Sequence, residues 1–107
     1  MRATMMDAPL SLNHLVERAA RIFHDIEVVS LAPSKEKVRH TYEDIYRRSR
    51  ALAKALQEAG LKQTDRVATM MWNHHAHLET YYGVPMAGGV YHTLNIRLSP
   101  KDIIYIA

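Results

Sequence analysis

Strand-like and helix-like segments alternate from Arg66 onward, and this order restricts the fold more than any other feature of the chain. The apolar run RVATMMW has the length of a strand but no alternation, which is typical of a strand buried on both faces. A helical segment, HHAHLETYYGVPMAG, separates it from a second strand, GVYHTLN. Two strands joined by a helix of this length lie parallel in one sheet. We therefore expect an α/β fold.

The first forty residues predict a helix followed by a hairpin. Apolar residues recur at helical spacing in SLNHLVERAARIF, and Ser11 is placed to cap that helix. IEVVSLA and VRHTY have the composition of strands and are separated by the polar turn PSKEK. We predict that these two strands form a β-hairpin. Residues 1–10, which precede the helix, are expected to be flexible.

Two further helices are marked by their ends. Thr41 and Asp44 resemble a capping box, although the box prefers Glu or Gln to Asp at its last position. The helix that begins at Thr41 should end at Gly60, because only glycine adopts the left-handed C′ conformation at low cost. Ser99 as N-cap and Pro100 at the first helical position begin the last helix.

Length and composition indicate one small globular domain. The chain has 107 residues, of which 48% are hydrophobic, so it is too apolar for a disordered segment. Its net charge is only +3, and the basic residues are mixed with acidic ones, so we expect no nucleic-acid partner.

Composition also bears on where the protein works. The lack of cysteine rules out disulfides and is compatible with a reducing cytoplasm. The longest uncharged stretch, YYGVPMAGGVYHTLNI, is interrupted by glycine and proline and is too short to span a membrane. The N-terminus lacks the apolar run of a signal peptide. We therefore expect a soluble, cytoplasmic protein.

Three clustered histidines are the first candidates for chemistry. His74, His75 and His77 form an H-H-x-H pattern, and on a helix His74 and His77 would share a face that could bind zinc. Glu79 lies nearby, but not in the H-E-x-x-H arrangement that joins two metal ligands to a general base. We favour an exposed polar face at the start of a helix and keep zinc binding as the lesser alternative.

The segment GVPMAGG imitates the spacing of a phosphate-binding loop between Gly83 and Gly88. The lysine that should follow Gly88 is missing, because Gly89 and Val90 come next, so nothing would reach the outer phosphates. We interpret these glycines as a helix end that packs tightly against the next strand.

The remaining candidates have structural interpretations. Four basic residues of the long helix could touch an anionic partner, but a solvated helix face is favoured. They are Arg47, Arg48, Arg50 and Lys54. An apolar trio is interpreted as core and strand-end packing, namely Met70, Met71 and Trp72. Since no serine lies in a G-x-S-x-G context either, we assign no catalytic, cofactor-binding or metal-binding residue.

Several segments in combination resemble the N-terminal part of AMP-forming acyl-CoA synthetases, in the superfamily of fatty-acid–CoA ligases, acetyl-CoA synthetases and luciferases. GLKQTDRVA resembles the family's Gly-Leu-x-x-Gly-Asp-Arg-Val-Ala segment, with Thr64 where glycine is usual. YYGVPMAGGV resembles its Gly-Val-x-x-Ala-Gly-Gly-Val helix and strand, and LNIRLSPKDIIYI resembles the segment that follows. HTLN is similar to the medium- and long-chain fatty-acid branch. The resemblance covers residues 10–107.

The resemblance implies a reaction for full-length members. They activate a carboxylate with ATP as an acyl-adenylate, and coenzyme A then displaces AMP to form a thioester. This chemistry calls for a phosphate loop, an acidic magnesium ligand, a ribose-binding aspartate and a mobile lysine. In the family these groups lie beyond the matching segment, so Gly83, Gly88 and Gly89 carry over only as structural glycines. ATP, magnesium and CoA are thus implied for full-length members, and none is expected in this chain.

We therefore expect residues 1–107 to be an incomplete N-terminal portion of an AMP-dependent synthetase/ligase domain. It would comprise an N-terminal helix, a β-hairpin and a βαβα unit with parallel strands, and would itself be inactive. A final helix of about two turns suggests a chain that has been cut. The expected partner is the remainder of the synthetase domain, with self-association through an exposed sheet edge as a second option. The alternative is a standalone binding module that uses its sheet edge or its basic helix.

Overall fold

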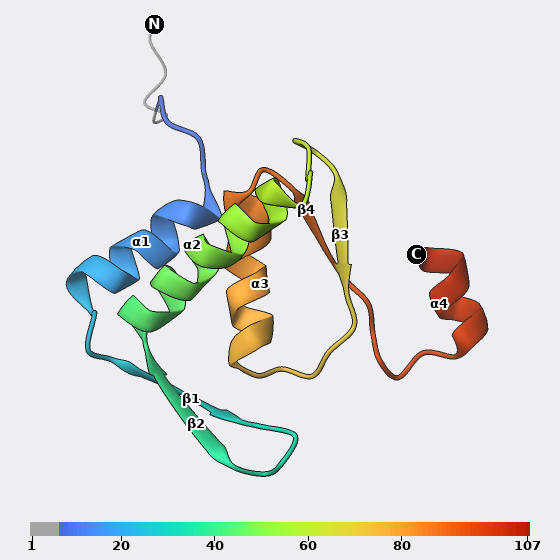
Figure 1. The fold of residues 1–107 in the computed structure, drawn as a ribbon, viewed down its shortest axis with the longest axis horizontal. Coiled ribbons are helices and arrows are strands. Elements are labelled where there is room, and N and C mark those ends of the chain that lie inside the picture. The colour runs from blue at the N-terminus through green and yellow to red at the C-terminus, as the bar shows by residue number, and fades with distance from the viewer. Residues whose placement is uncertain (1–6) are drawn as a thin grey trace, which may run out of the picture.

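The computed structural model describes residues 7–107, and these residues form four helices and two small sheets (Figure 1). The elements in chain order are α1 (Leu12–Ile22), β1 (Glu27–Leu31), β2 (Lys37–Thr41), α2 (Tyr42–Glu58), β3 (Arg66–Thr69), α3 (His75–Met86), β4 (Val90–Thr93) and α4 (Pro100–Ile106). The α/β class is confirmed, as is the order of helix, hairpin and βαβα unit. The expected flexibility of residues 1–10 falls mostly on residues 1–6, which lie outside the described residues.

The hairpin of β1 and β2 projects away from the helices (Figure 1). Its strands are antiparallel, with Val28 opposite His40 and Ser30 opposite Val38. Opposite residues of a strand pair point to the same face of the sheet. These four side chains are half-buried and alternate with exposed neighbours, except that Thr41 at the end of β2 is half-buried as well. The covered face of the hairpin therefore carries one valine and one polar side chain from each strand.

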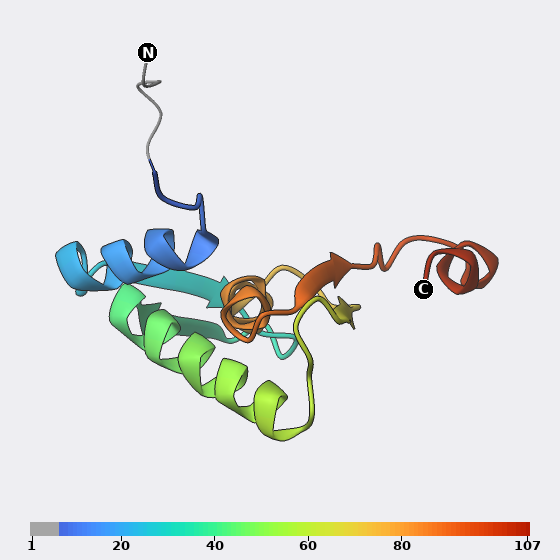
Figure 2. The same ribbon diagram turned by 90° about the horizontal axis from the view of Figure 1, so that it is seen from above.

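Strands β3 and β4 form the predicted parallel pair, with Val67 opposite Tyr91. The Tyr91 hydroxyl lies 2.8 Å from Thr80 Oγ1 on α3 and accepts a hydrogen bond from Thr69 Oγ1 at 2.9 Å. Figure 2 shows this pair beside α3, with α4 further out on the far side. One face of the sheet is thus joined to α3 by the side-chain hydrogen bond between Tyr91 and Thr80.

The prediction that the first parallel strand is buried on both faces is wrong for this chain. On the opposite face, a hollow lined by Arg66, Ala68, His92, Ile106 and Ala107 leaves Arg66 and Ala68 exposed. Strand β3 ends at Thr69, and of the three residues interpreted as core and strand-end packing only Met71 is half-buried. Met70 is 58% exposed and Trp72 is 62% exposed. An uninterrupted apolar run in a strand therefore does not reveal whether other elements pack on both of its faces.

Helices α2 and α3 make the closest contact between elements. A Cβ atom added at Gly83 of α3 would lie 3.0 Å from both the Ser49 carbonyl oxygen and Leu52 Cδ2 of α2. Real Cβ atoms rarely come that close to neighbouring atoms, so only glycine fits at this crossing without movement. The core gathers around this contact and consists of Val16, Ile45, Ser49, Ala53, Val84 and Ala87.

An ion pair joins the same two helices. Arg48 of α2 donates from Nε to Glu79 Oε1 at 2.6 Å and from Nη2 to Glu79 Oε2 at 3.3 Å. The Glu79 side chain is 11% exposed, whereas that of Arg48 is 44% exposed. The hydrogen bonds to Glu79 raise the pKa of Arg48, so this side chain is firmly cationic. Arg48 therefore does not belong to a freely solvated basic face, in contrast to the sequence interpretation.

The predicted helix ends are confirmed. The Thr41 N–H donates to Asp44 Oδ2 at 3.1 Å, and the Asp44 N–H donates to Thr41 Oγ1 at 3.1 Å, so the capping box forms with Asp. The bond from the Thr41 N–H is the main reason that the pKa of Asp44 lies below its ordinary value. Helix α2 ends before Gly60, which has a φ of +96°.

Helix α3 continues through Pro85 to Met86. Gly88 follows with a φ of +89°, and a Cβ at Gly89 would lie 3.1 Å from side-chain atoms of Leu61 and Val84. The interpretation as a helix end is therefore confirmed for Gly88 and Gly89, of which Gly89 is tightly packed, whereas Gly83 lies inside α3 and packs against α2. No helix in residues 7–107 combines the length and apolar character needed to cross a membrane.

Thr64 has a φ of +71°, in the left-handed region that β-branched residues rarely occupy. It is the position where the resembling family usually has glycine, so the departure noted in the sequence coincides with a strained backbone. The Thr64 N–H donates to the Gly88 carbonyl oxygen at 2.9 Å, which holds this loop against the end of α3. The native hydrogen bond thus retains a conformation that suits glycine better than threonine.

We expect the substitution Thr64→Gly to stabilise the chain by about 0.5–1 kcal/mol. Removing the left-handed penalty of about 1–2 kcal/mol outweighs the entropic cost of an added glycine, which is about 0.5–1 kcal/mol. Urea unfolding followed by circular dichroism measures the difference. The control Gln63→Gly, at a neighbouring position without positive φ, should lower stability instead. Equal effects of the two substitutions would contradict the strain at Thr64.

Arg48→Met should lower the free energy of unfolding by about 1–3 kcal/mol, since it leaves the buried Glu79 carboxylate without its partner. The expected loss of unfolding free energy is smaller than for a fully buried ion pair, because water reaches the Arg48 side chain. The matched control is Arg47→Met on the same helix, whose 2.8 Å pair with Asp44 is exposed. This control should leave the midpoint of the same urea titration almost unchanged. Similar losses for both arginines would show that the pair with Glu79 is not special.

Candidate functional site

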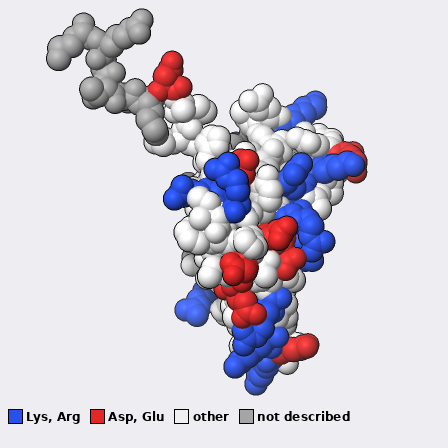
Figure 3. All heavy atoms as spheres, turned by 90° about the vertical axis from the view of Figure 1, so that its left-hand side faces the viewer, with Lys and Arg blue, Asp and Glu red and all other residues white. Residues whose placement is uncertain are grey.

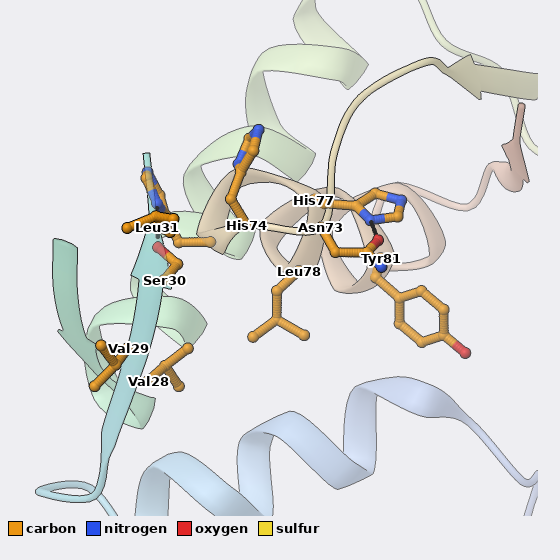
Figure 4. A pocket seen from close by; sticks show the side chains of 10 residues that line it. Val28, Val29, Ser30, Leu31, Asn73, His74, His77, Leu78 and Tyr81 are labelled. Carbon is orange, nitrogen blue, oxygen red and sulfur yellow. Dashed lines mark hydrogen bonds between the residues drawn. The ribbon is translucent and has the colours of Figure 1, made fainter. Parts of the chain in front are cut away.

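A hollow of about 490 Å³ lies between β1 and the first turns of α3 (Figure 4). Val28, Ser30 and Leu31 line it from the strand, and Leu78 and Tyr81 line it from the helix. The three histidines at the start of α3 complete its rim. The hollow is apolar at its base and polar at one end, so the chemistry of this region is concentrated at the histidines.

His75 is the histidine that faces the hairpin. Its Nδ1 lies 2.9 Å from Ser30 Oγ of β1, and its ring centre lies 4.8 Å from that of His40 on β2. Burial lowers the pKa of His75, and the nearby His40, His74 and Arg48 act in the same direction while Glu79 opposes them. The surroundings of His75 therefore favour its neutral imidazole form.

His75 and Glu79 belong to one stripe of α3, because residues four apart lie on the same face of a helix. Gly83, four residues further, is the position where α3 touches α2. The Arg48 ion pair fixes the Glu79 carboxylate next to the two facing imidazoles. One ligand atom each from His40, His75 and Glu79 lie within 4.8 Å of one another. This set combines two nitrogen donors and one oxygen donor from two separate elements.

The structure does not bring His74 and His77 together as the zinc alternative required. His74 is the N-cap of α3, and its Nδ1 accepts a hydrogen bond from the Ala76 N–H at 3.2 Å. His77 Nδ1 lies 2.8 Å from Asn73 Oδ1. Figure 4 shows the two rings pointing in different directions. The favoured interpretation of an exposed polar face is also only partly right, because all three histidines are half-buried.

A second hollow, of about 410 Å³, lies at the carboxyl ends of the two parallel strands. Met71 and Trp72 follow β3, while Asn95 and Arg97 follow β4. The Arg97 guanidinium lies 5.9 Å from the centre of the Trp72 ring. In open α/β sheets, ligands bind in the crevice outside the carboxyl ends of the strands. By this rule the second hollow is a candidate place for a small molecule, and its lining also includes His77, whose Nδ1 lies 2.8 Å from Asn73 Oδ1.

The other basic residues of α2 lie on the surface as predicted. Arg47 pairs with Asp44, Lys54 lies 3.7 Å from Glu58, and Arg50 stacks over the Tyr46 ring at 5.6 Å. On the face seen in Figure 3, acidic side chains lie among the basic ones over the middle of the molecule, and several lysine and arginine side chains gather at its lower end.

Sequence reasoning missed the two hairpin residues that lie next to His75, namely Ser30 and His40. Both occupy strand positions that alternate with valine on the covered face of the hairpin. Polar residues at such positions must find partners, because an inward-facing polar group without a hydrogen bond is costly. Their alternation with Val28 and Val38 was the available signal. It could not, however, indicate that the partner is His75, which is 45 residues from Ser30.

Comparison with curated proteins gives close relatives over almost the whole chain. The chain is 49% identical over 104 residues to the long-chain-fatty-acid–CoA ligase of Thermus thermophilus, which covers 97% of this chain and 19% of that relative. It is 44% identical to the medium-chain-fatty-acid–CoA ligase of Ectopseudomonas oleovorans, with 99% and 19% covered. The chain thus spans about a fifth of the length of these relatives.

Solved structures show the same fold. The N-terminal domain of FACL13 from Mycobacterium tuberculosis, in a crystal structure with an inhibitor, matches with a TM-score of 0.79 at 25% identity and covers 90% of this chain and 24% of that one. A fatty acid AMP ligase from Legionella pneumophila matches with a TM-score of 0.73 at 21% identity, covering 88% and 16%. The family model of the AMP-binding enzymes matches residues 16–107. The chain therefore belongs to the AMP-binding enzyme family.

Proposed function

We propose that residues 1–107 form the N-terminal portion of the AMP-dependent synthetase/ligase domain of a fatty-acid–CoA ligase. The observation that carries this proposal is the 49% identity to the Thermus thermophilus ligase across 97% of this chain. The complete domain would couple ATP and a fatty acid to an acyl-adenylate, and then transfer the acyl group to CoA in the cytoplasm. Its partner would be the remainder of that domain.

Within such a domain, this chain supplies framework and not the groups that grip ATP. The parallel pair of β3 and β4 has one face fastened to α3, while Arg66 and Ala68 on the other face are exposed. Trp72 and Ile104 are also largely exposed. Further strands and helices packed on this side would bury these apolar groups, which is favourable in free energy. The hollow beyond the carboxyl ends of β3 and β4 would then become an internal cleft.

The alternative of a standalone binding module has no support in the comparisons, whose matches are ligases of greater length. A basic helix as its binding surface is also weakened by the structure. Arg47, Arg48 and Lys54 each lie near a carboxylate of this chain. An anionic partner would have to compete with these internal pairs.

A chimeric enzyme tests the proposal. The matching segment of the Thermus thermophilus ligase is replaced by this chain, and palmitoyl-CoA formation is measured. We expect the chimera to keep its rate within about tenfold of the parent enzyme, a loss of less than about 1.4 kcal/mol in transition-state stabilisation. The 107-residue chain alone should give no ATP–pyrophosphate exchange with palmitate, because it contains no Pro-Lys-Gly phosphate loop.

Two controls define the result. The ligase without its matching segment gives the background rate. A chimera with Val84→Asp, which places an unpaired charge at a fully buried position, should fall to that background. A folded chimera without activity would contradict the proposal, as would exchange activity in the isolated chain.

A further inference from the structure

The cluster of His40, His75 and Glu79 has a donor set that suits a transition metal. Two imidazoles and one carboxylate are a ligand combination found around zinc, in which the remaining position is taken by water or another group. The ligand atoms lie within 4.8 Å of one another. Ligand atoms around tetrahedral zinc are separated by about 3.4 Å, so the widest pair would have to close by up to about 1.4 Å to complete the geometry.

The positions of the ligands allow that contraction. His75 and Glu79 are both on α3, which packs against α2, whereas His40 is on the projecting hairpin (Figure 1). His40 directly precedes Thr41, the N-cap of α2, so rotation of the His40 side chain is the movement that would bring its ring toward the other two ligands. This arrangement would fasten the end of the hairpin strand to the first turn of α3.

The groups around the ligands act as supporting partners of a metal site. When His75 Nδ1 donates to Ser30 Oγ, at 2.9 Å, Nε2 keeps the lone pair that a metal needs. Arg48 holds the Glu79 carboxylate in place through both of its oxygens. A carboxylate has about four lone-pair sites, so two hydrogen bonds from Arg48 leave room for a metal. The positive charge of Arg48 opposes a cation, and this repulsion limits the affinity.

We propose that His40, His75 and Glu79 form a zinc-class divalent cation site that joins the hairpin to α3. The site is separate from the hollow at the carboxyl ends of β3 and β4, and it does not depend on the proposed ligase activity. It also differs from the His74 and His77 pair suggested by the sequence, because those two rings are turned apart and bonded to other partners.

The test is a zinc titration of the purified 107-residue chain in competition with a chromophoric chelator, with circular dichroism of each sample. We expect one zinc ion per chain and a rise in melting temperature, because a ligand that binds only the folded state stabilises it. His40→Ala and His75→Ala should each weaken zinc binding by about tenfold or more, as expected for the loss of a direct ligand. Ser30→Ala should weaken it by about tenfold through the orientation of His75.

His77→Ala is the matched control, since it removes an imidazole from the same helix end and should leave zinc affinity unchanged. If His40→Ala does not fold by circular dichroism, the mild substitution Ser30→Ala decides in its place. Three results would overturn the proposal: no zinc binding by the unaltered chain, unchanged affinity in folded His40→Ala or Ser30→Ala, or an equal loss in His77→Ala.

Discussion

The contact between α2 and α3 at Gly83 is the constraint on which the other features depend. Glycine inside a helix costs about 0.5–1 kcal/mol relative to alanine. Here it lets the backbone of α3 approach Ser49 and Leu52 at a distance that a side chain would prevent. The close approach buries Ile45 and Val84 on either side. A locally unfavourable residue is therefore offset by the packing of two helices.

The same contact determines where the polar groups of α3 point. Because Gly83, Glu79 and His75 are spaced by four residues, placing Gly83 against α2 also turns Glu79 toward Arg48 and His75 toward the hairpin. A buried carboxylate adds little net stability, since desolvation opposes the attraction of its partner. Its effect is instead to disfavour other rotations of α3, in which the carboxylate would lack that partner.

Features encoded by nearby residues could be predicted from the sequence, whereas features that join distant segments could not. Ser11, Thr41, Gly60 and Ser99 mark helix ends correctly, since a cap is a contact within a few residues. The parallel pairing of β3 and β4 also followed from the helix between them.

The pairing of Arg48 with Glu79 could not be predicted, because 31 residues separate them and several arginines on α2 were equally plausible partners. The exposure of Met70 and Trp72 escaped prediction for a related reason. An apolar run indicates which side chains favour burial. It does not indicate whether other elements of the chain pack against them. The family resemblance added what local patterns lack, namely the wider domain in which such strands occur.

The stripe on α3 has one more consequence, for measurement. Since His75 moves with α3 and His40 with the hairpin, the magnetic environment of each ring depends on how far the helix stands from its neighbours. The chemical shifts of the imidazole protons of His40 and His75 would thus report their spacing in solution. They would register whether additional segments, once docked on the sheet, leave the spacing of α3 and the hairpin as it is in this chain.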